Sequence, residues 1–165
     1  AKAVSVTLVD NRPKQIDLSG HFGWKVYYGD GTRLDLLRQA GAETAQAIIF
    51  CTDELTPDED ALEPILEAFP QAAVLVRVFD RRQLIRVRAL PLAGTVREVF
   101  ESAVCMGRQA LIALGVEEAE VDRVEQEYRR RDAGRLEAQS ESGDMAAGDH
   151  FAFREGTPLA PEPQP

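Results

Sequence analysis

Residues 24–41 read WKVYYGDGTRLDLLRQAG, and this stretch decides the fold class. An aromatic and β-branched run ends at Gly29 and Asp30, as a buried strand does. Thr32 and Arg33 then open a helical pattern, with Leu34, Leu37 and Ala40 on one face and Gly41 as its stop signal. A strand followed at once by a helix is the repeating unit of an α/β sheet.

Three further apolar runs share this design. VSVTLVD (4–10), AQAIIFCTD (45–53) and AAVLVRVFD (72–80) are short, and each ends in an aspartate. Helical patterns separate them. Continuous apolar strands alternating with helices predict a Rossmann-like α/β fold, with a parallel sheet covered by helices on both faces.

The composition excludes several classes of protein. The 165 residues suit one domain with a core, and the net charge of −9 argues against a nucleic-acid partner. No apolar run approaches the ~18 residues of a membrane span, so this chain is expected to be soluble. Cys51 and Cys105 are expected to be reduced, partly buried thiols. His21 and His150 fall in a loop and a tail without a nucleophile motif or metal-ligand spacing, so the sequence predicts neither a catalytic residue nor a metal site.

The pattern changes after Gly94, which divides the chain. We expect a Rossmann-like domain over 1–99, dimerisation helices over 100–139 and a disordered Pro-rich tail over 140–165. The first of these helices carries an apolar stripe, which is predicted to pack against a second copy of the chain. The stripe consists of Phe100, Val104, Gly107, Leu111 and Leu114.

The carboxyl ends of the strands are the candidate ligand site, because open α/β sheets bind ligands there. Asp10 and Asp30 end neighbouring strands and could meet the ribose or adenine of a nucleotide, with the N–H groups of Thr32 and Arg33 facing the same crevice. The alternative is that each aspartate only caps a helix or starts a turn. The glycine-rich phosphate loop GxGxxG does not occur in the chain. The first strand and this loop are therefore expected to precede residue 1.

Several motifs together resemble a known family. GDGTRLDLLRQAGA (29–42), with LVD, IIFCTD and VRVFDRRQLIRVRAL, resembles the KTN or RCK domain, the TrkA-N type regulator of potassium transport. Within it, REVFESAVCMGRQALIALG (97–115) resembles the Kef-type glutathione-gated potassium/proton antiporters, whose matching helix crosses to a partner subunit. The resemblance covers about residues 4–135.

The resemblance implies ligands and the residues that meet them. AMP or NAD(H) would bind at the strand ends, with Asp10 at the ribose and Asp30, Thr32 and Arg33 lining the pocket. Glutathione would bind near the dimer interface, where Arg108 matches an arginine expected to hold one of its carboxylates. Asp132 stands where the Kef branch carries an asparagine, so its charge is expected to repel the anionic tripeptide unless Arg131 or another base intervenes.

The sequence thus predicts a ligand-sensing, non-catalytic regulatory domain. It would gate a glutathione-regulated potassium/proton antiporter at the cytoplasmic face of the bacterial inner membrane, as a homodimer joined by the crossover helix. A membrane antiporter domain and a quinone-reductase-like ancillary flavoprotein are the implied partners. Two alternatives remain: a nucleotide-sensing domain of another potassium transport system, and a fragment of a Rossmann NAD-dependent oxidoreductase.

Overall fold

The computed structural model describes residues 4–13, 25–52 and 57–152. Its elements follow the chain in the order β1 (Thr7–Asp10), β2 (Lys25–Tyr28), α2 (Leu34–Ala40), η1 (Ala42–Thr44), β3 (Ala47–Phe50), α3 (Glu59–Ala68), β4 (Ala73–Val78), α4 (Arg81–Val87), β5 (Gly94–Arg97), α5 (Glu98–Ala113), α6 (Glu118–Ser142) and η2 (Asp149–Phe151). Two compact units result. Unit 1 comprises Ala1–Phe79 with Arg86–Val96, and unit 2 comprises Asp80–Ile85 with Arg97–Pro165.

Unit 1 contains two sheets rather than one. β1 pairs with β2 in parallel, and β3 pairs with β4 in parallel in a second sheet of order β3-β4-β5. The strand–helix alternation and the parallel pairing of a Rossmann-like fold are confirmed.

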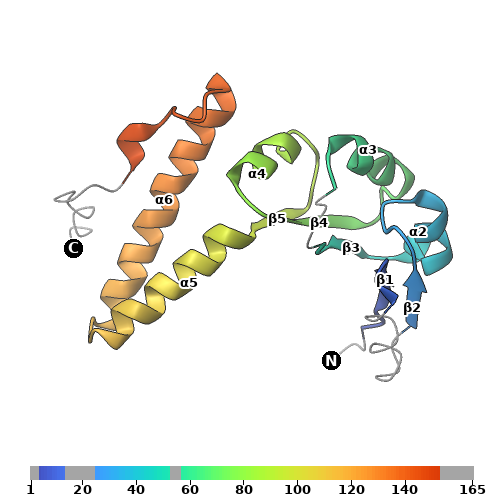
Figure 1. Ribbon diagram of the computed structural model, residues 1–165, viewed down its shortest axis with the longest axis horizontal. Coiled ribbons are helices and arrows are strands. Elements are labelled where there is room, and N and C mark those ends of the chain that lie inside the picture. The colour runs from blue at the N-terminus through green and yellow to red at the C-terminus, as the bar shows by residue number, and fades with distance from the viewer. Residues whose placement is uncertain (1–3, 14–24, 53–56, 153–165) are drawn as a thin grey trace. The chain divides into compact units, whose positions relative to one another are not determined.

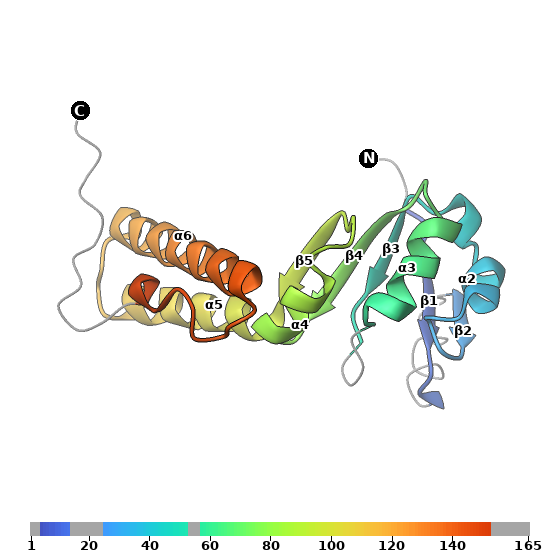
Figure 2. The same cartoon turned by 90° about the horizontal axis from the view of Figure 1, so that it is seen from above.

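The core of unit 1 lies on one face of the second sheet. β3 alternates between exposed and buried residues: Ile48 and Phe50 are buried, whereas the side chain of Ile49 is 63% exposed. Leu62 and Ile65 of α3 are fully buried, and α3 lies along one side of this sheet (Figures 1 and 2). The expectation of helices on both faces is therefore wrong for the described residues, because the period-two burial of β3 is that of a sheet with one covered face.

The ends of the unit 1 helices follow ordinary capping rules. Gly41 closes α2 in the left-handed conformation, with φ of +98°, and its N–H donates to the carbonyls of Leu37 and Arg38. Asp58 caps α3, because its side chain accepts a hydrogen bond from the N–H of Ala61 at 3.1 Å. The end of α2 and the start of α3 thus lie where the local sequence supplies a partner for terminal backbone groups, whereas the start of α2 has no side-chain cap.

Unit 2 is built on the helix pair α5 and α6, which lie side by side (Figures 1 and 2). Phe100 of α5 stacks on Tyr128 of α6 with ring centroids 5.7 Å apart, and Val104 and Val121 are buried. The first part of the predicted stripe therefore packs within the chain rather than against a second copy. The outward residues of α5 are a different set, Val99, Ala103, Met106, Ala110 and Ala113, here called the α5 outer face.

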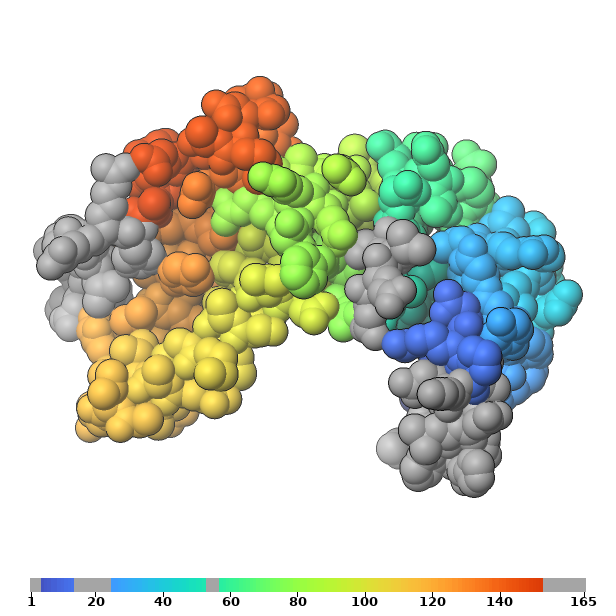
Figure 3. Space-filling model, viewed as in Figure 1, coloured from blue at the N-terminus to red at the C-terminus, as the bar shows by residue number. Residues whose placement is uncertain are grey.

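The end of α6 departs from the predicted tail. The helix runs to Ser142, three residues beyond the predicted boundary, and Gly143 ends it in the left-handed conformation. Residues 143–152, here called the return segment, then fold back along α6 and include η2 (Figure 3). The disorder expected from residue 140 therefore does not describe residues 140–152, and the rest of that tail lies outside the described residues.

Candidate functional site

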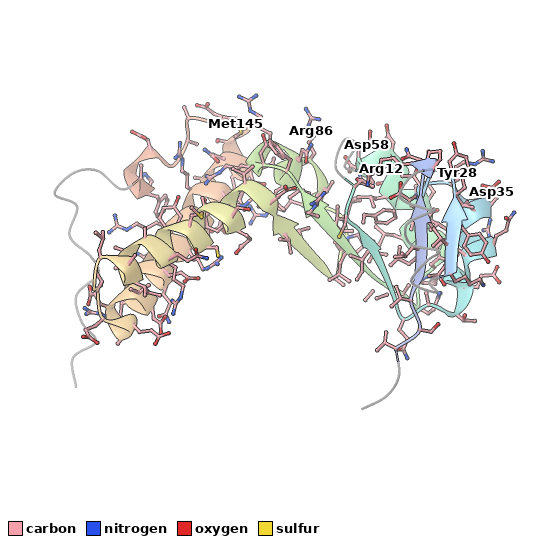
Figure 4. All side chains as sticks on the ribbon, turned by 60° about the horizontal axis from the view of Figure 1, so that its bottom comes forward. Arg12, Tyr28, Asp35, Asp58, Arg86 and Met145 are labelled. Atoms are coloured by element: carbon pink, nitrogen blue, oxygen red, sulfur yellow. The ribbon has the colours of Figure 1, made fainter. Side chains whose placement is uncertain are left out.

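The strand ends of the first sheet bring the two predicted aspartates to one edge. Asp10 is the register partner of Tyr28, and the N–H of Gly29 donates to the carbonyl of Asp10 at 3.0 Å. Asp30 follows two residues after Tyr28. Arg12 and Tyr28 lie at this same end of the β1–β2 sheet (Figure 4). The parallel pairing that the sequence predicted therefore places both carboxylates beyond the same strand ends.

Gly29 is required at the turn that carries Asp30. Its φ is +146°, which L side chains rarely adopt. A Cβ at this position would also lie 2.8 Å from Cδ2 of Leu36. Any other residue would therefore strain the backbone, and the end of the Leu36 side chain would have to move. The glycine of the GD pair thus fixes where the Asp30 carboxylate sits.

Asp30 organises its own loop. Its Oδ1 accepts hydrogen bonds from the N–H of Thr32 at 2.9 Å and from Oγ1 of Thr32 at 2.8 Å. The backbone bond is the main reason that the pKa of Asp30 is lowered from its ordinary value, so the group is anionic at neutral pH. Oδ1 is thus engaged in the loop, and a ligand would approach through Oδ2.

Thr32 and Arg33 do not act as the expected helix-start donors. The N–H of Thr32 binds Asp30, and the N–H of Arg33 donates to the carbonyl of Asp30 at 3.2 Å. The helix begins only at Leu34. The Arg33 guanidinium forms an exposed ion pair with Asp35 at 2.7 Å. The Asx turn at Asp30 thus satisfies both backbone donors before the helix starts, which corrects the predicted role of these N–H groups.

Asp10 has a partner that the sequence analysis did not foresee. Its Oδ1 accepts the N–H of Arg12 at 2.7 Å, and the Arg12 guanidinium pairs with the same carboxylate at 3.3 Å. A ribose hydroxyl donating to Asp10 would therefore share the carboxylate with Arg12. The motif DNR at 10–12 carries this signal, because a basic residue two positions after an acid can fold back onto it.

A second cluster of charges lies in unit 2, around Asp132 of α6. Arg81 and Arg97 both donate to its carboxylate, whose side chain is 10% exposed. Arg97 also stacks on the Phe100 ring, with its guanidinium carbon 4.0 Å from the centroid. Burial lowers the pKa of Arg81; Asp132 opposes this shift, whereas Arg97 and Arg135 reinforce it. Two guanidinium groups thus share one carboxylate, and the charge of Arg135 acts on Arg81 beside them. We call these four residues the Asp132 cluster.

This arrangement meets the exception that the sequence analysis allowed for repulsion at Asp132, while glutathione binding itself stays a prediction. The other base that the sequence analysis allowed for is present as Arg81 and Arg97, while Arg131 instead pairs with Glu127. The surroundings of Asp132 are therefore positive rather than negative. Sequence reasoning missed Arg97 because it lies 35 positions before Asp132. The side chain of Arg97 is 9% exposed, and this burial cannot be read from the sequence.

Arg108 lies elsewhere in unit 2. Its guanidinium pairs with three acids of α6, Glu118 at 3.2 Å, Asp122, and Glu125 at 3.4 Å. Asp122 and Asp132 are ten residues apart on one helix, which corresponds to about 15 Å along its axis. Within one chain, the structure therefore does not bring Arg108 and Asp132, the two predicted glutathione residues, to one site.

Other kinds of site are not found in the described part of the chain. No group of three or more His, Cys, Asp or Glu residues within 4–13, 25–52 and 57–152 is placed to hold a metal ion. No helix in these ranges is long and apolar enough to cross a membrane. Cys51 and Cys105 are free thiols and both are exposed, which corrects the expectation that they are partly buried.

The comparison with protein families decides where the chain belongs. The model of the TrkA-N domain matches residues 1–95, more than half of the chain. The chain belongs to the TrkA-N family. The match includes Asp10, Asp30, Thr32 and Arg33, so the strand-end site lies in the TrkA-N part, whereas α5 and α6 follow it.

Relatives of this TrkA-N chain cover both units. A glutathione-regulated potassium-efflux system protein of Haemophilus influenzae is 35% identical over 135 residues, 82% of this chain and 22% of the relative. KefC of Cronobacter sakazakii is 34% identical over 150 residues, 91% of this chain and 23% of the relative. The chain thus spans about a fifth of the length of these curated relatives.

Two solved structures resemble this TrkA-N chain. The AMP-bound form of the Shewanella denitrificans Kef CTD is 32% identical with a TM-score of 0.66, over 82% of this chain and 83% of that one. The TrkA-N domain of the Escherichia coli inner membrane protein ybaL has a TM-score of 0.53 at 14% identity, over 62% and 76% of the two chains. The second likeness concerns the fold alone.

Proposed function

We propose that this chain is the ligand-sensing regulatory part of a glutathione-regulated potassium/proton antiporter. The observation that carries the proposal is the likeness to the Kef CTD of Shewanella denitrificans, which extends over 82% of this chain and so includes helices of unit 2 as well as the TrkA-N part. In this role the chain catalyses no reaction. It works at the cytoplasmic face of the bacterial inner membrane, joined to the membrane antiporter domain of the intact protein.

An adenine nucleotide is the proposed ligand of the strand ends. Asp30 offers Oδ2, and Asp10 offers the carboxylate that it shares with Arg12. Carboxylates at such strand ends accept hydrogen bonds from ribose hydroxyls. The similar Shewanella structure is an AMP-bound form, which supports AMP ahead of NAD(H). Thr32 supports the loop rather than the ligand, and Arg33 lines the outer rim of the site.

Glutathione is the proposed regulatory ligand, and we place it at the Asp132 cluster rather than at Arg108. Glutathione carries two carboxylates, and a guanidinium pairs with a carboxylate in bidentate geometry. Arg81 and Arg97 offer two such groups on one acid, and Arg135 adds a positive charge that acts on Arg81. A glutathione carboxylate would displace Asp132 from one of them. Binding would bias a dimer between two arrangements and so gate the membrane part.

The proposed assembly is a homodimer formed through α5, with a quinone-reductase-like flavoprotein as an ancillary partner. The α5 outer face repeats apolar residues at intervals of three and four, as a helix–helix seam does. Phe100 and Val104 of the stripe first predicted from the sequence already pack within the chain. We therefore propose the α5 outer face as the surface that contacts the second copy.

Calorimetric titration of glutathione into the chain tests the ligand and its place together. We expect Arg97→Ala to weaken glutathione binding at least tenfold, because a charge-assisted pair is lost. Asp132→Asn should tighten binding, since it frees the two guanidinium groups that Asp132 holds. Arg108→Ala is the matched control and should leave the affinity unchanged. Loss of binding in Arg108→Ala but not in Arg97→Ala would restore the site that the sequence predicted.

A parallel titration with AMP tests the nucleotide site. Asp10→Ala combined with Asp30→Ala should abolish AMP binding, whereas Asp35→Ala, an acid of the same helix region that pairs outward with Arg33, should not. Oxidation of NADH by the chain without an added flavoprotein would instead favour the oxidoreductase alternative.

A further inference from the structure

The return segment is joined to the Asp132 cluster by one buried side chain, Gln139. This residue is 1% exposed. Its Nε2 donates to the carbonyl of Met145 in the return segment at 2.6 Å, and its Oε1 accepts from Arg81 at 2.9 Å. Met145 lies at the end of the helix pair where the chain turns back (Figure 4). One amide therefore connects the segment to Arg81, which in turn holds Asp132.

Two glycines allow the return segment to lie close to α6. A Cβ on Gly134, inside the helix, would lie 2.7 Å from Cε1 of Phe151. Gly148 has φ of +72°, and its Cβ would lie 3.0 Å from Cα of Arg135. A glycine inside a helix lowers helix stability, so its presence fits a close contact better than helix formation. The missing side chain of Gly134 thus leaves a space on α6 that the Phe151 ring fills, here called the Phe151 seat.

The seated segment covers a donor that has no partner among the described residues. Nε of Arg135 is buried and makes no hydrogen bond to any residue within the described ranges. Native structures leave few such groups, and those that exist are often explained by a movement or an unseen ligand. The charge of Arg135 acts on Arg81 of the Asp132 cluster. Arg135 also lies next to Gly148 of the return segment, where an added Cβ would lie 3.0 Å from its Cα. An anion that reached this donor would have to disturb the contacts of the segment.

We propose that the return segment is a cover over the Asp132 cluster, and that seating of the cover and binding of an anion at the cluster oppose each other. That the anion is glutathione rests on the proposed function. The opposition between anion binding and seating of the return segment does not depend on that function. Coupling between two sites is reciprocal, so an anion at the cluster should loosen the segment, and an unseated segment should raise affinity for the anion. The segment would thereby set the ligand threshold of the sensor.

Hydrogen exchange of the full chain, measured by mass spectrometry over residues 144–152, tests the seat. Gly134→Ala should speed exchange there because the new methyl group displaces Phe151. Gly107→Ala is the matched control, since it also changes a helix glycine but meets open space within 4 Å. Phe151→Ala should unseat the segment without touching the cluster. Equal exchange in Gly134→Ala and Gly107→Ala would overturn the seat.

Glutathione titration of the same variants tests the coupling. We expect Phe151→Ala to bind glutathione about fivefold or more tightly than the unchanged chain. Faster exchange in Phe151→Ala with an unchanged affinity would overturn the proposal.

If none of these variants binds glutathione, glutathione is not the ligand. Hydrogen exchange over residues 144–152 then tests by itself whether the return segment is linked to the Asp132 cluster. Arg81→Ala should then speed exchange over 144–152, because Gln139 loses one of its two partners. Arg129→Ala is its control, since Arg129 pairs with Glu101 and Glu125 instead. The same exchange in both would overturn the coupling.

Discussion

Asp132 is the side chain on which two part-buried arginines of unit 2 converge. It compensates Arg81 and Arg97, two guanidinium groups that could not otherwise be withdrawn from water at a tolerable cost. The same carboxylate therefore serves the fold and restrains the proposed anion site. Any variant that frees the arginines for a ligand should weaken the domain that holds them.

Asp132→Asn tests this double role through stability. We expect it to lower the free energy of unfolding by about 2 to 4 kcal/mol, because two part-buried guanidinium groups lose their counter-charge. Urea denaturation measures the change. Asp122→Asn is the control: Asp122 pairs with Arg108 but is 51% exposed, so its loss should cost under about 1 kcal/mol. Equal losses in the two variants would contradict a special role for Asp132.

Glu127 makes a pH-dependent contribution to stability. Hydrogen bonds from Arg130 and Arg131 lower the pKa of Glu127 from 4.5 to about 2. A carboxyl group whose pKa is lower in the folded chain stabilises it above its unfolded pKa, and this contribution is lost as pH falls. Stability should therefore decline between about pH 4.5 and pH 2. Denaturation of Glu127→Gln over this range should show a shallower decline, and an identical slope would count against the pairing.

At the residue scale, the sequence could place Asp10 and Asp30 together because both follow strands, and parallel pairing brings such ends to one edge. It could not place Arg97 beside Asp132, since that contact depends on how α5 and α6 pack. It also misjudged Thr32 and Arg33, because Asp30 satisfies their N–H groups before the helix begins.

At the scale of elements, α3 depends on its first residues. The side chain of Asp58 accepts a hydrogen bond from the N–H of Ala61 and so caps the helix. Asp58→Ala should therefore cost about 1 kcal/mol in the free energy of unfolding. Asp60→Ala, an acid inside the first turn, should cost only about 0.3 kcal/mol through the helix dipole. A larger loss in Asp60→Ala would show that the cap has been assigned to the wrong residue.

The elements themselves were largely readable from the sequence. Apolar runs identified the strands, and Gly41 marked the end of α2. The stripe on α5 was harder, because both sides of this helix carry apolar residues. Contacts in the structure, such as the stacking of Phe100 on Tyr128 and the burial of Val104, distinguish the side that meets α6 from the α5 outer face. The fold of the return segment could not be predicted, because its small and polar residues carry no helix or strand pattern. It depends on contacts with Gly134 and Gln139 of α6.

At the scale of the whole molecule, the α5 outer face should decide assembly. The side chain of Met106 is 67% exposed at the middle of this face. Met106→Glu should shift the proposed dimer toward monomer, because a charge buried in an apolar seam is costly. Light scattering over a concentration series measures the change. Ile112→Glu is the control, since Ile112 is 48% exposed but lies about 120° around the helix from Met106. Dissociation by Ile112→Glu alone would place the interface elsewhere.

The division into two sheets has a practical consequence for handling the chain. Within the described strands, β1 and β3 each have one side without a hydrogen-bonded neighbour. Such edges present unpaired N–H and C=O groups that recruit further strands, and Ile49 adds an exposed apolar side chain to β3. A peptide strand whose backbone pairs with either of these edges should therefore slow amide exchange in the strand that it joins.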